Sequence, residues 1–217
     1  MRNKIRSLLK NSVDNGFNGY RLWDCVHLPD TPFYPKGFNS LQDFTSSKWP
    51  TSIAGEYCLK NFPETKFNSD LFKSVVFSKI SHDKPIDRIA IHLRVGDVIK
   101  NKNEKGIKGV QSRQRFLPPK DYNLVTEKIL PFKDLPVFLV FGMHQHEGLN
   151  ESISYIEYIY KIFESNGFKV NLQSSTPDED FLFLCASSHL VSSKANYFQK
   201  NKALIRLCAK DSIIIDL

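Results

Sequence analysis

Residues 88–97 read Arg-Ile-Ala-Ile-His-Leu-Arg-Val-Gly-Asp, a run of branched apolar residues that ends in an arginine, a glycine and an aspartate. The first part, residues 88–93, has the length and composition of a buried β-strand. Charged side chains at the end of a buried strand are costly unless they are paired or meet a ligand. This segment therefore predicts both the strand on which the fold is built and the position of its chemistry.

From residue 88 onward, short β-branched runs alternate with longer amphipathic stretches, which is the pattern of βαβ units with a parallel sheet. Ile153, Ile156 and Phe163 recur at helical spacing, and Gly167 follows as a helix terminator. We expect strands at 88–93, 136–141, 169–172, 189–192 and 212–216, and helices at 118–130, 150–166, 178–186 and 194–209. The pattern predicts a doubly wound, Rossmann-like parallel sheet, which binds ligands at the carboxyl ends of its strands where the strand order reverses.

The first 85 residues have a different character, with aromatic residues, prolines and turn signals such as Asn15-Gly16. Modest helical stretches occur at 39–45, 51–61 and 69–80. We predict a smaller, mostly helical N-terminal region over 1–85, which ends in a polar hinge at 81–85. The sheet domain is expected over 86–217.

The chain has 217 residues, 41% of them apolar, which is enough for one well-packed domain. Its four cysteines form no Cys-x-x-Cys pair, so the sequence predicts neither a zinc site nor a disulfide framework. The basic N-terminus is not followed by the apolar core of a signal peptide, and no run of about 20 apolar residues could span a membrane. We therefore expect no membrane span and a cytoplasmic location.

The formal net charge of +7 favours anionic partners, a group that includes nucleic acids, anionic lipids and nucleotide-sugar phosphates. Lysines and arginines are scattered, with concentrations at 100–108 and 194–206, and no aromatic–basic repeat typical of RNA binding occurs. Nucleic acid binding is therefore a secondary alternative. Its main support is the segment 100–108, and such a run is more often a solvated loop.

Arg94 suits a pyrophosphate, because its planar fork donates two parallel charge-assisted hydrogen bonds and keeps its proton. Gly96 would let the backbone approach the ligand. The alternative is that Arg94 and Asp97 pair with each other at the transition from strand to loop. Residue chemistry alone does not decide between the anion site and the ion pair.

A second polar segment, His144-Gln145-His146-Glu147, follows the strand expected at 136–141. Two imidazoles and a carboxylate could bind zinc, but this spacing on a loop is not a recognised zinc pattern. We expect no metal and interpret the segment as the rim of a ligand site.

His92, Arg94, Gly96 and Asp97 resemble the His-x-Arg-x-Gly-Asp signature of the fucosyltransferase superfamily, which includes the α-1,2-, α-1,6- and protein O-fucosyltransferases. The resemblance implies a GT-B type enzyme in which the sheet domain is the C-terminal lobe. It also implies that Arg94 binds the β-phosphate of GDP-fucose. Val95 stands where many members have a second arginine.

Two later segments extend the resemblance. Residues 115–118, Arg-Phe-Leu-Pro, are similar to the step that follows the signature in bacterial and viral members, and residues 178–194 resemble the family's late motif. That motif implies that Ser192, Ser193 and Lys194 bind the donor phosphates, at a helix start whose amides favour anions. Residues 195–198, Ala-Asn-Tyr-Phe, stand where the family usually has Ser-Ser-Phe-Ser.

The acidic residues 178–180 suit the first turn of a helix, where negative charges interact favourably with the helix dipole. For Asp180 we also keep the alternative of a position near the donor nucleoside. The glycine-rich strand-turn with which α-1,2 members begin has no counterpart in residues 1–85. The acceptor lobe is therefore expected to be reduced, or to be supplied by a second copy of the chain or by a partner.

The resemblance implies transfer of L-fucose from GDP-fucose to a glycan hydroxyl, with inversion at the anomeric carbon and without metal or other cofactor. Arg94 would stabilise the departing diphosphate, His92 would orient the loop or contact the donor, and Asp97 would fix Arg94 and its turn. Two alternatives stay open. One is a transferase that uses another nucleotide sugar, and the other is a non-catalytic nucleotide-sugar or glycan-binding module of the same fold.

Overall fold

The computed structural model describes residues 1–16, 77, 80, 84–96, 99, 122–143, 147–192 and 212–216. The chain divides into two compact units, Met1–Asp14 with His82–Leu217, and Asn15–Ser81. The first unit contains the sheet. Nearly all of the second unit, with the helices expected at 39–45 and 51–61, lies outside the described residues, as does the helix expected at 194–209.

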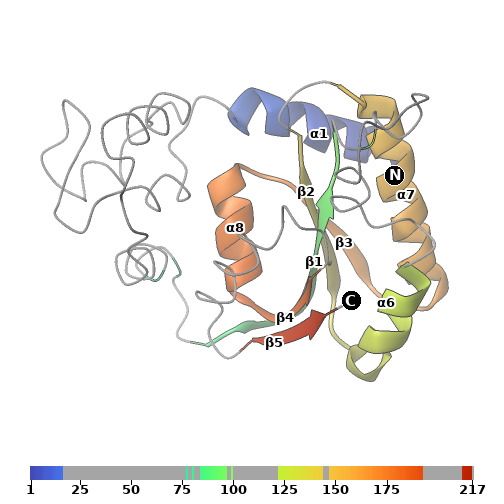
Figure 1. Ribbon diagram of the computed structural model, residues 1–217, viewed down its shortest axis with the longest axis vertical. Helices are drawn as coiled ribbons and strands as arrows, with labels where there is room; N and C mark the ends of the chain where they lie inside the picture. Colours follow the sequence, from blue (N-terminus) through green and yellow to red (C-terminus); the bar gives the residue numbers. More distant parts are fainter. Residues whose placement is uncertain are drawn as a thin grey trace, which may run out of the picture. The chain divides into compact units, whose positions relative to one another are not determined.

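The sheet has five parallel strands (Figure 1). They are β1 (Ile86–Arg94), β2 (Val137–Gly142), β3 (Val170–Gln173), β4 (Ser187–Ser192) and β5 (Ile213–Asp216), in the spatial order β3-β2-β1-β4-β5. Every expected strand is present, with ends that differ by no more than two residues. The prediction of an α/β fold with a parallel sheet is confirmed.

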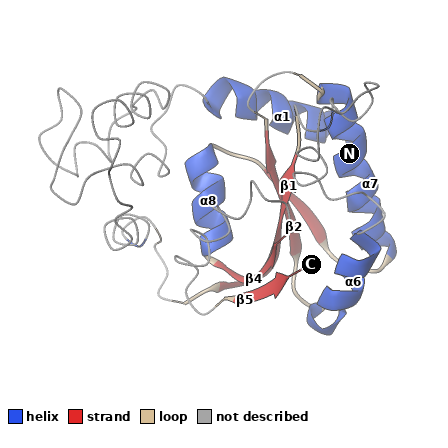
Figure 2. Cartoon of the chain, viewed as in Figure 1, coloured by secondary structure: helices blue, strands red, loops and turns tan. Residues whose placement is uncertain are grey.

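Helices cover both faces of the sheet (Figure 2). On one face lie α6 (Tyr122–Ile129), the short 3₁₀ helix η3 (Leu130–Phe132) and α7 (Leu149–Ser165), and on the other lies α8 (Pro177–Cys185). The sheet is therefore doubly wound, as predicted. Gly167 ends α7 with a φ of 79°, a left-handed conformation in which its amide donates to the carbonyl of Glu164.

The main core lies between the sheet and the helices α6 and α7. Ile89, Ile91 and Leu93 of β1 are at most 2% exposed and belong to one apolar cluster. The same cluster includes residues from β2, α6 and α7: Val137, Leu139, Phe141, Val125, Ile129, Ile153, Ile156, Ile159 and Phe163. Burying one such side chain contributes roughly 1.5–3 kcal/mol, so this alternation fixes which face of β1 turns inward.

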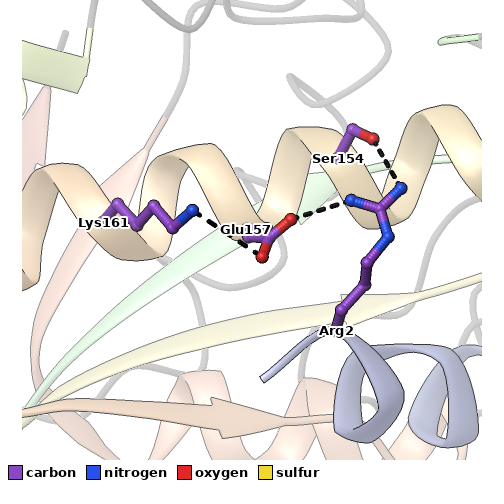
Figure 3. Close-up of polar contacts among 4 residues, drawn as sticks. All are labelled: Arg2, Ser154, Glu157 and Lys161. Atoms are coloured by element: carbon purple, nitrogen blue, oxygen red, sulfur yellow. Dashed lines mark hydrogen bonds and ion pairs between the residues drawn. The ribbon is translucent and has the colours of Figure 1, made fainter.

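Helix α1 (Arg2–Gly16) packs on the sheet unit. Ile5 and Leu9, one helical turn apart, are fully buried in the core cluster. Arg2 donates to Glu157 (Nη1–Oε2, 2.9 Å) and to Ser154 (Nη2–Oγ, 3.2 Å) on α7 (Figure 3). The first helix thus differs from the expected assignment of residues 1–85 to one N-terminal region, because its apolar stripe is buried against the sheet unit. No helix in the described parts of the chain is long and apolar enough to cross a membrane.

Candidate functional site

The strand order reverses between β1 and β4. From β1 the chain builds outward through α6 and α7 to β2 and β3, and it then returns through α8 on the opposite face to β4 on the other side of β1. Open parallel sheets bind their ligands at this point, beyond the carboxyl ends of the strands. Arg94 and Ser192 are the last residues of β1 and β4, so the structure brings these two predicted site residues to neighbouring strand ends.

His92 and Arg94 lie on the face of the sheet that carries α8. Ala90 is in register with Phe138, whose ring packs against Phe183 of α8 with centroids 5.1 Å apart, and alternate residues of a strand share a face. Both His92 and Arg94 are partly exposed, whereas Leu93 between them is 1% exposed on the opposite face. The two polar side chains therefore project from the sheet on one side at its carboxyl edge.

Gly96 adopts a left-handed conformation with a φ of 83°. Its amide donates to Oγ of Ser152 at 3.0 Å, and its carbonyl accepts from the amide of Ile99 at 3.0 Å. A Cβ at this position would make only ordinary contacts, the closest with Cγ of Met143 at 3.8 Å. The glycine is thus required by its backbone conformation, and its amide is bonded within the protein.

Ser152 is a functional candidate that the sequence analysis missed. It is fully buried in the first turn of α7, and its hydroxyl also donates to the carbonyl of Gly148 at 2.6 Å. The available signal was its position, because Ser152 stands one turn before Ile156 on the apolar stripe of the helix. A serine in such a stripe needs a buried hydrogen-bond partner.

Ser12 of α1 makes the same kind of bridge at the next strand. Its Oγ accepts from the amide of Met143, just after β2, at 3.0 Å and donates to the carbonyl of Leu9 at 2.8 Å. Beyond β3, the hydroxyl of Ser174 lies 3.5 Å from the carbonyl of Leu8. Helix α1 therefore lies over the carboxyl ends of β2 and β3 (Figure 1).

Asp180 lies in the first turns of α8, away from the ends of β1 and β4. Its buried carboxylate accepts from Nε2 of Gln173 at 3.0 Å and from the amide of Ser175 at 3.2 Å. Gln173 is in register with Val140, and Val140 with His92, so two strand spacings, about 10 Å, separate Gln173 from His92. Burial raises the pKa of Asp180 to about 6, and the two hydrogen bonds oppose that shift.

The other described acidic residue at the start of α8 has a capping role. Thr176 and Glu179 form a capping box, in which the Thr176 hydroxyl accepts from the Glu179 amide and the Glu179 carboxylate accepts from the Thr176 amide. Hydrogen bonds from Ser175 and Thr176 lower the pKa of Glu179. This capping agrees with the prediction that acidic residues here belong to the first helical turn.

Arg88 lies near the amino end of β1, and its guanidinium donates hydrogen bonds to groups within the protein. Its Nε donates to Oγ of Ser187 at 2.8 Å, and its Nη2 donates to the carbonyl of Phe183 near the end of α8 at 2.9 Å. Burial lowers its pKa to about 10. The side chain joins β1, β4 and α8 and has a structural role.

Several predicted site residues lie outside the described residues. They are Asp97, Ser193 and Lys194, together with His144, Gln145 and His146 of the segment that could have suggested a metal. Within the described ranges, no group of three His, Cys, Asp or Glu side chains could hold a metal ion.

Comparison of the chain with protein-family models, with curated proteins and with solved structures gives no match.

Proposed function

We propose that the chain is a metal-independent glycosyltransferase that transfers L-fucose from GDP-fucose to a hydroxyl of a glycan. One observation carries the proposal. Arg94 closes β1 next to the end of β4, where the strand order reverses and a parallel sheet binds its ligands. A guanidinium in this position suits a diphosphate, because it offers two parallel charge-assisted hydrogen bonds and a permanent charge.

In this reaction the acceptor oxygen attacks the anomeric carbon from the side opposite the diphosphate. The bond between the anomeric carbon and the β-phosphate oxygen breaks, the configuration inverts, and the acceptor proton leaves to a base. Arg94 stabilises the negative charge that develops on the departing diphosphate. Such preorganised electrostatic stabilisation is usually the largest catalytic contribution.

The remaining predicted residues receive roles in the same proposal. His92, on the same face as Arg94, orients the strand end or contacts the donor, and Asp97 fixes Arg94 and its turn. Ser192, Ser193 and Lys194 add hydroxyls, amides and a charge at the end of β4. Asp180 forms the distant, nucleoside side of the site, and a reduced acceptor lobe is completed by a second copy or a partner in a GT-B arrangement.

A second candidate function is a non-catalytic module that binds a nucleotide sugar or a glycan. The observation that favours it concerns Val95, which is 1% exposed and belongs to the core cluster. The position at which many fucosyltransferases have a second arginine therefore faces the protein interior. Arg94 would have to hold the diphosphate with fewer cationic contacts.

Calorimetric titration with GDP, GDP-fucose and two other nucleotide sugars, without metal, tests the proposal. We expect GDP and GDP-fucose to bind, and Arg94→Ala to weaken both by about 10- to 100-fold because it removes a bidentate charged contact. Lys161→Ala, which removes an equal charge from an exposed site on α7, is the matched control and should leave affinity within about twofold.

Turnover separates the two candidate functions. Release of GDP from GDP-fucose in the presence of a panel of glycans supports the transferase, whereas binding without turnover favours the module. If the wild type binds another nucleotide sugar but not GDP-fucose, that nucleotide sugar becomes the proposed donor. If no nucleotide sugar binds, the proposal is wrong.

A further inference from the structure

A buried hydroxyl bonds to the turn that follows Arg94 at the end of β1. Ser152 accepts a hydrogen bond from the amide of Gly96, two residues after Arg94, and donates one to the carbonyl of Gly148. The serine is fully buried, so neither bond can be replaced by water without rearrangement. A single side chain therefore joins the end of β1 to the first turn of α7.

This bridge adds a polar restraint to a segment whose apolar residues Val95 and Ile99 are buried in the core cluster. The backbone of Gly96 has a φ of 83°, which glycine adopts readily. Glycine can also adopt many other backbone conformations. With the Ser152 bond in place, the amide and the carbonyl of Gly96 are both bonded, to Ser152 and to Ile99. Strand pairing with Gly142 holds the backbone of Arg94, and the Ser152 bond ties the chain that leaves β1 directly after it to α7.

Ser12 supplies a built-in comparison. It is also buried, at 5% exposure, also accepts from the amide that follows a strand, and also donates to a helix carbonyl. The amide that Ser12 binds is that of Met143, which follows β2, whereas Ser152 binds the amide of Gly96, which follows β1. The two serines thus make chemically equivalent bridges, only one of which holds the Arg94 turn.

We infer that Ser152 is a positioning residue for Arg94, which holds the guanidinium in the orientation required to bind a phosphate anion. The part of this inference that concerns the anion rests on the proposed function. The part that concerns the orientation of Arg94 does not. Ser152 itself contacts no ligand and acts through the Gly96 turn.

The first test needs no ligand. In ¹⁵N-labelled protein, the Nε–Hε signal of Arg94, assigned by its loss in Arg94→Lys, and the amide of Gly96 are followed in Ser152→Ala and Ser12→Ala. In Ser152→Ala we expect the Arg94 signal to shift and the Gly96 amide to exchange about 10-fold faster, the effect of one lost hydrogen bond. In Ser12→Ala the Met143 amide should lose protection while both Gly96 and Arg94 keep their wild-type signals.

An unchanged Arg94 signal in Ser152→Ala overturns the inference, and so does an equal shift in both variants, because that would show general loosening. If Ser152→Ala does not fold, Ser152→Cys, which keeps the bulk and offers a weaker acceptor, carries the same test. Both alanine variants should lower the melting temperature by similar amounts. With a purely structural role for Ser152, the Gly96 amide would lose protection but the Arg94 signal would stay unchanged.

The second test uses inorganic pyrophosphate and GDP as probes. We expect Ser152→Ala to weaken their binding by about 10-fold or more, since small displacements of a binding group have large effects, and Ser12→Ala to leave it unchanged. If the wild type binds neither probe, the proposed function is wrong. The Arg94 signal still shows whether Ser152 orients Arg94. If wild type binds and both variants bind equally well, Ser152 does not position the ligand-binding group.

Discussion

The guanidinium carbon of Arg88 lies 3.4 Å from the centroid of the Phe183 ring, so a cation of β1 rests on an aromatic ring of α8. The same side chain bonds to Ser187 and to the carbonyl of Phe183. Arg88→Ala should lower the free energy of unfolding by about 2–4 kcal/mol, because it removes a cation–π contact and two charge-assisted hydrogen bonds. Urea titration monitored by circular dichroism measures the change.

Arg88→Lys is the control for charge alone. It should recover less than half of the lost stability, since an ammonium cannot reproduce the planar fork. Neither variant should alter nucleotide affinity, in contrast to Arg94→Ala. A lysine variant as stable as wild type would contradict the structural role assigned to the fork.

Asp180 gives the chain a pH dependence of known sign. Its pKa in the folded protein is raised from 3.8 to about 6, so the folded state binds more protons than the unfolded state between these values. The stability that Asp180 contributes is complete below pH about 4 and is lost as the pH rises through about 6. Asp180→Asn should therefore gain stability over wild type from pH 4 to pH 7.5, by up to about 3 kcal/mol.

Unfolding in urea at pH 4, 5.5 and 7.5, on wild type and Asp180→Asn, measures this difference directly. Glu179→Gln is a useful comparison, because its carboxylate has a lowered pKa and the sign is reversed. A stability difference that does not change with pH would show that Asp180 is ionised without penalty.

Gly96 and Gly167 have nearly the same backbone conformation, with φ values of 83° and 79°. Substitution by alanine should cost each variant about 1–2 kcal/mol of stability, the strain of a left-handed residue with a Cβ. At Gly167 the new Cβ would also meet the flexible end of Lys133, with Nζ at 2.8 Å, which can move away. Only Gly96→Ala should also weaken pyrophosphate binding, because only Gly96 lies in the turn after Arg94. Equal affinities of both variants for pyrophosphate would show that this turn does not contribute to the ligand site.

Helix α1 is held by its apolar side chains and only weakly by its ion pair. Ile5→Ala should reduce stability by about 2–5 kcal/mol, since Ile5 is fully buried. The exposed pair of Arg2 and Glu157, in a double-mutant cycle, should show a coupling of less than about 1 kcal/mol that falls with added salt. A coupling larger than the effect of Ile5→Ala would reverse this ranking.

The strands and the faces on which they are buried could be predicted from the sequence because their signals are local. Ile89, Ile91 and Leu93 alternate with Ala90 and His92 and so give β1 one face of large apolar residues, and the stripe ending at Phe163 before Gly167 fixes a helix and its end. The family resemblance had linked Arg94 and Ser192 in advance, and the strand order places the ends of β1 and β4 next to each other.

Other features depend on contacts between distant parts of the chain. In α1 the apolar face is marked by Ile5, Leu8 and Leu9, and nothing near them in sequence indicates the surface that they cover. The apolar stripe of α7 indicates that Ser152 is buried, but the amide partners of Ser12 and Ser152 cannot be identified from the sequence. Asp180 was predicted with two possible roles, and the structure shows it bonded to Gln173 at the end of β3.

The position of α1 over the ends of β2 and β3 also sets an order of events during synthesis. Arg2 and its partner Glu157 are 155 residues apart, so α1 leaves the ribosome long before α7 exists. At a translation rate of about 5–20 residues per second, the interval is roughly 8–30 s. Throughout that time the apolar stripe of α1 has no native surface to cover, so α1 can dock only after the strands and α7 have been made.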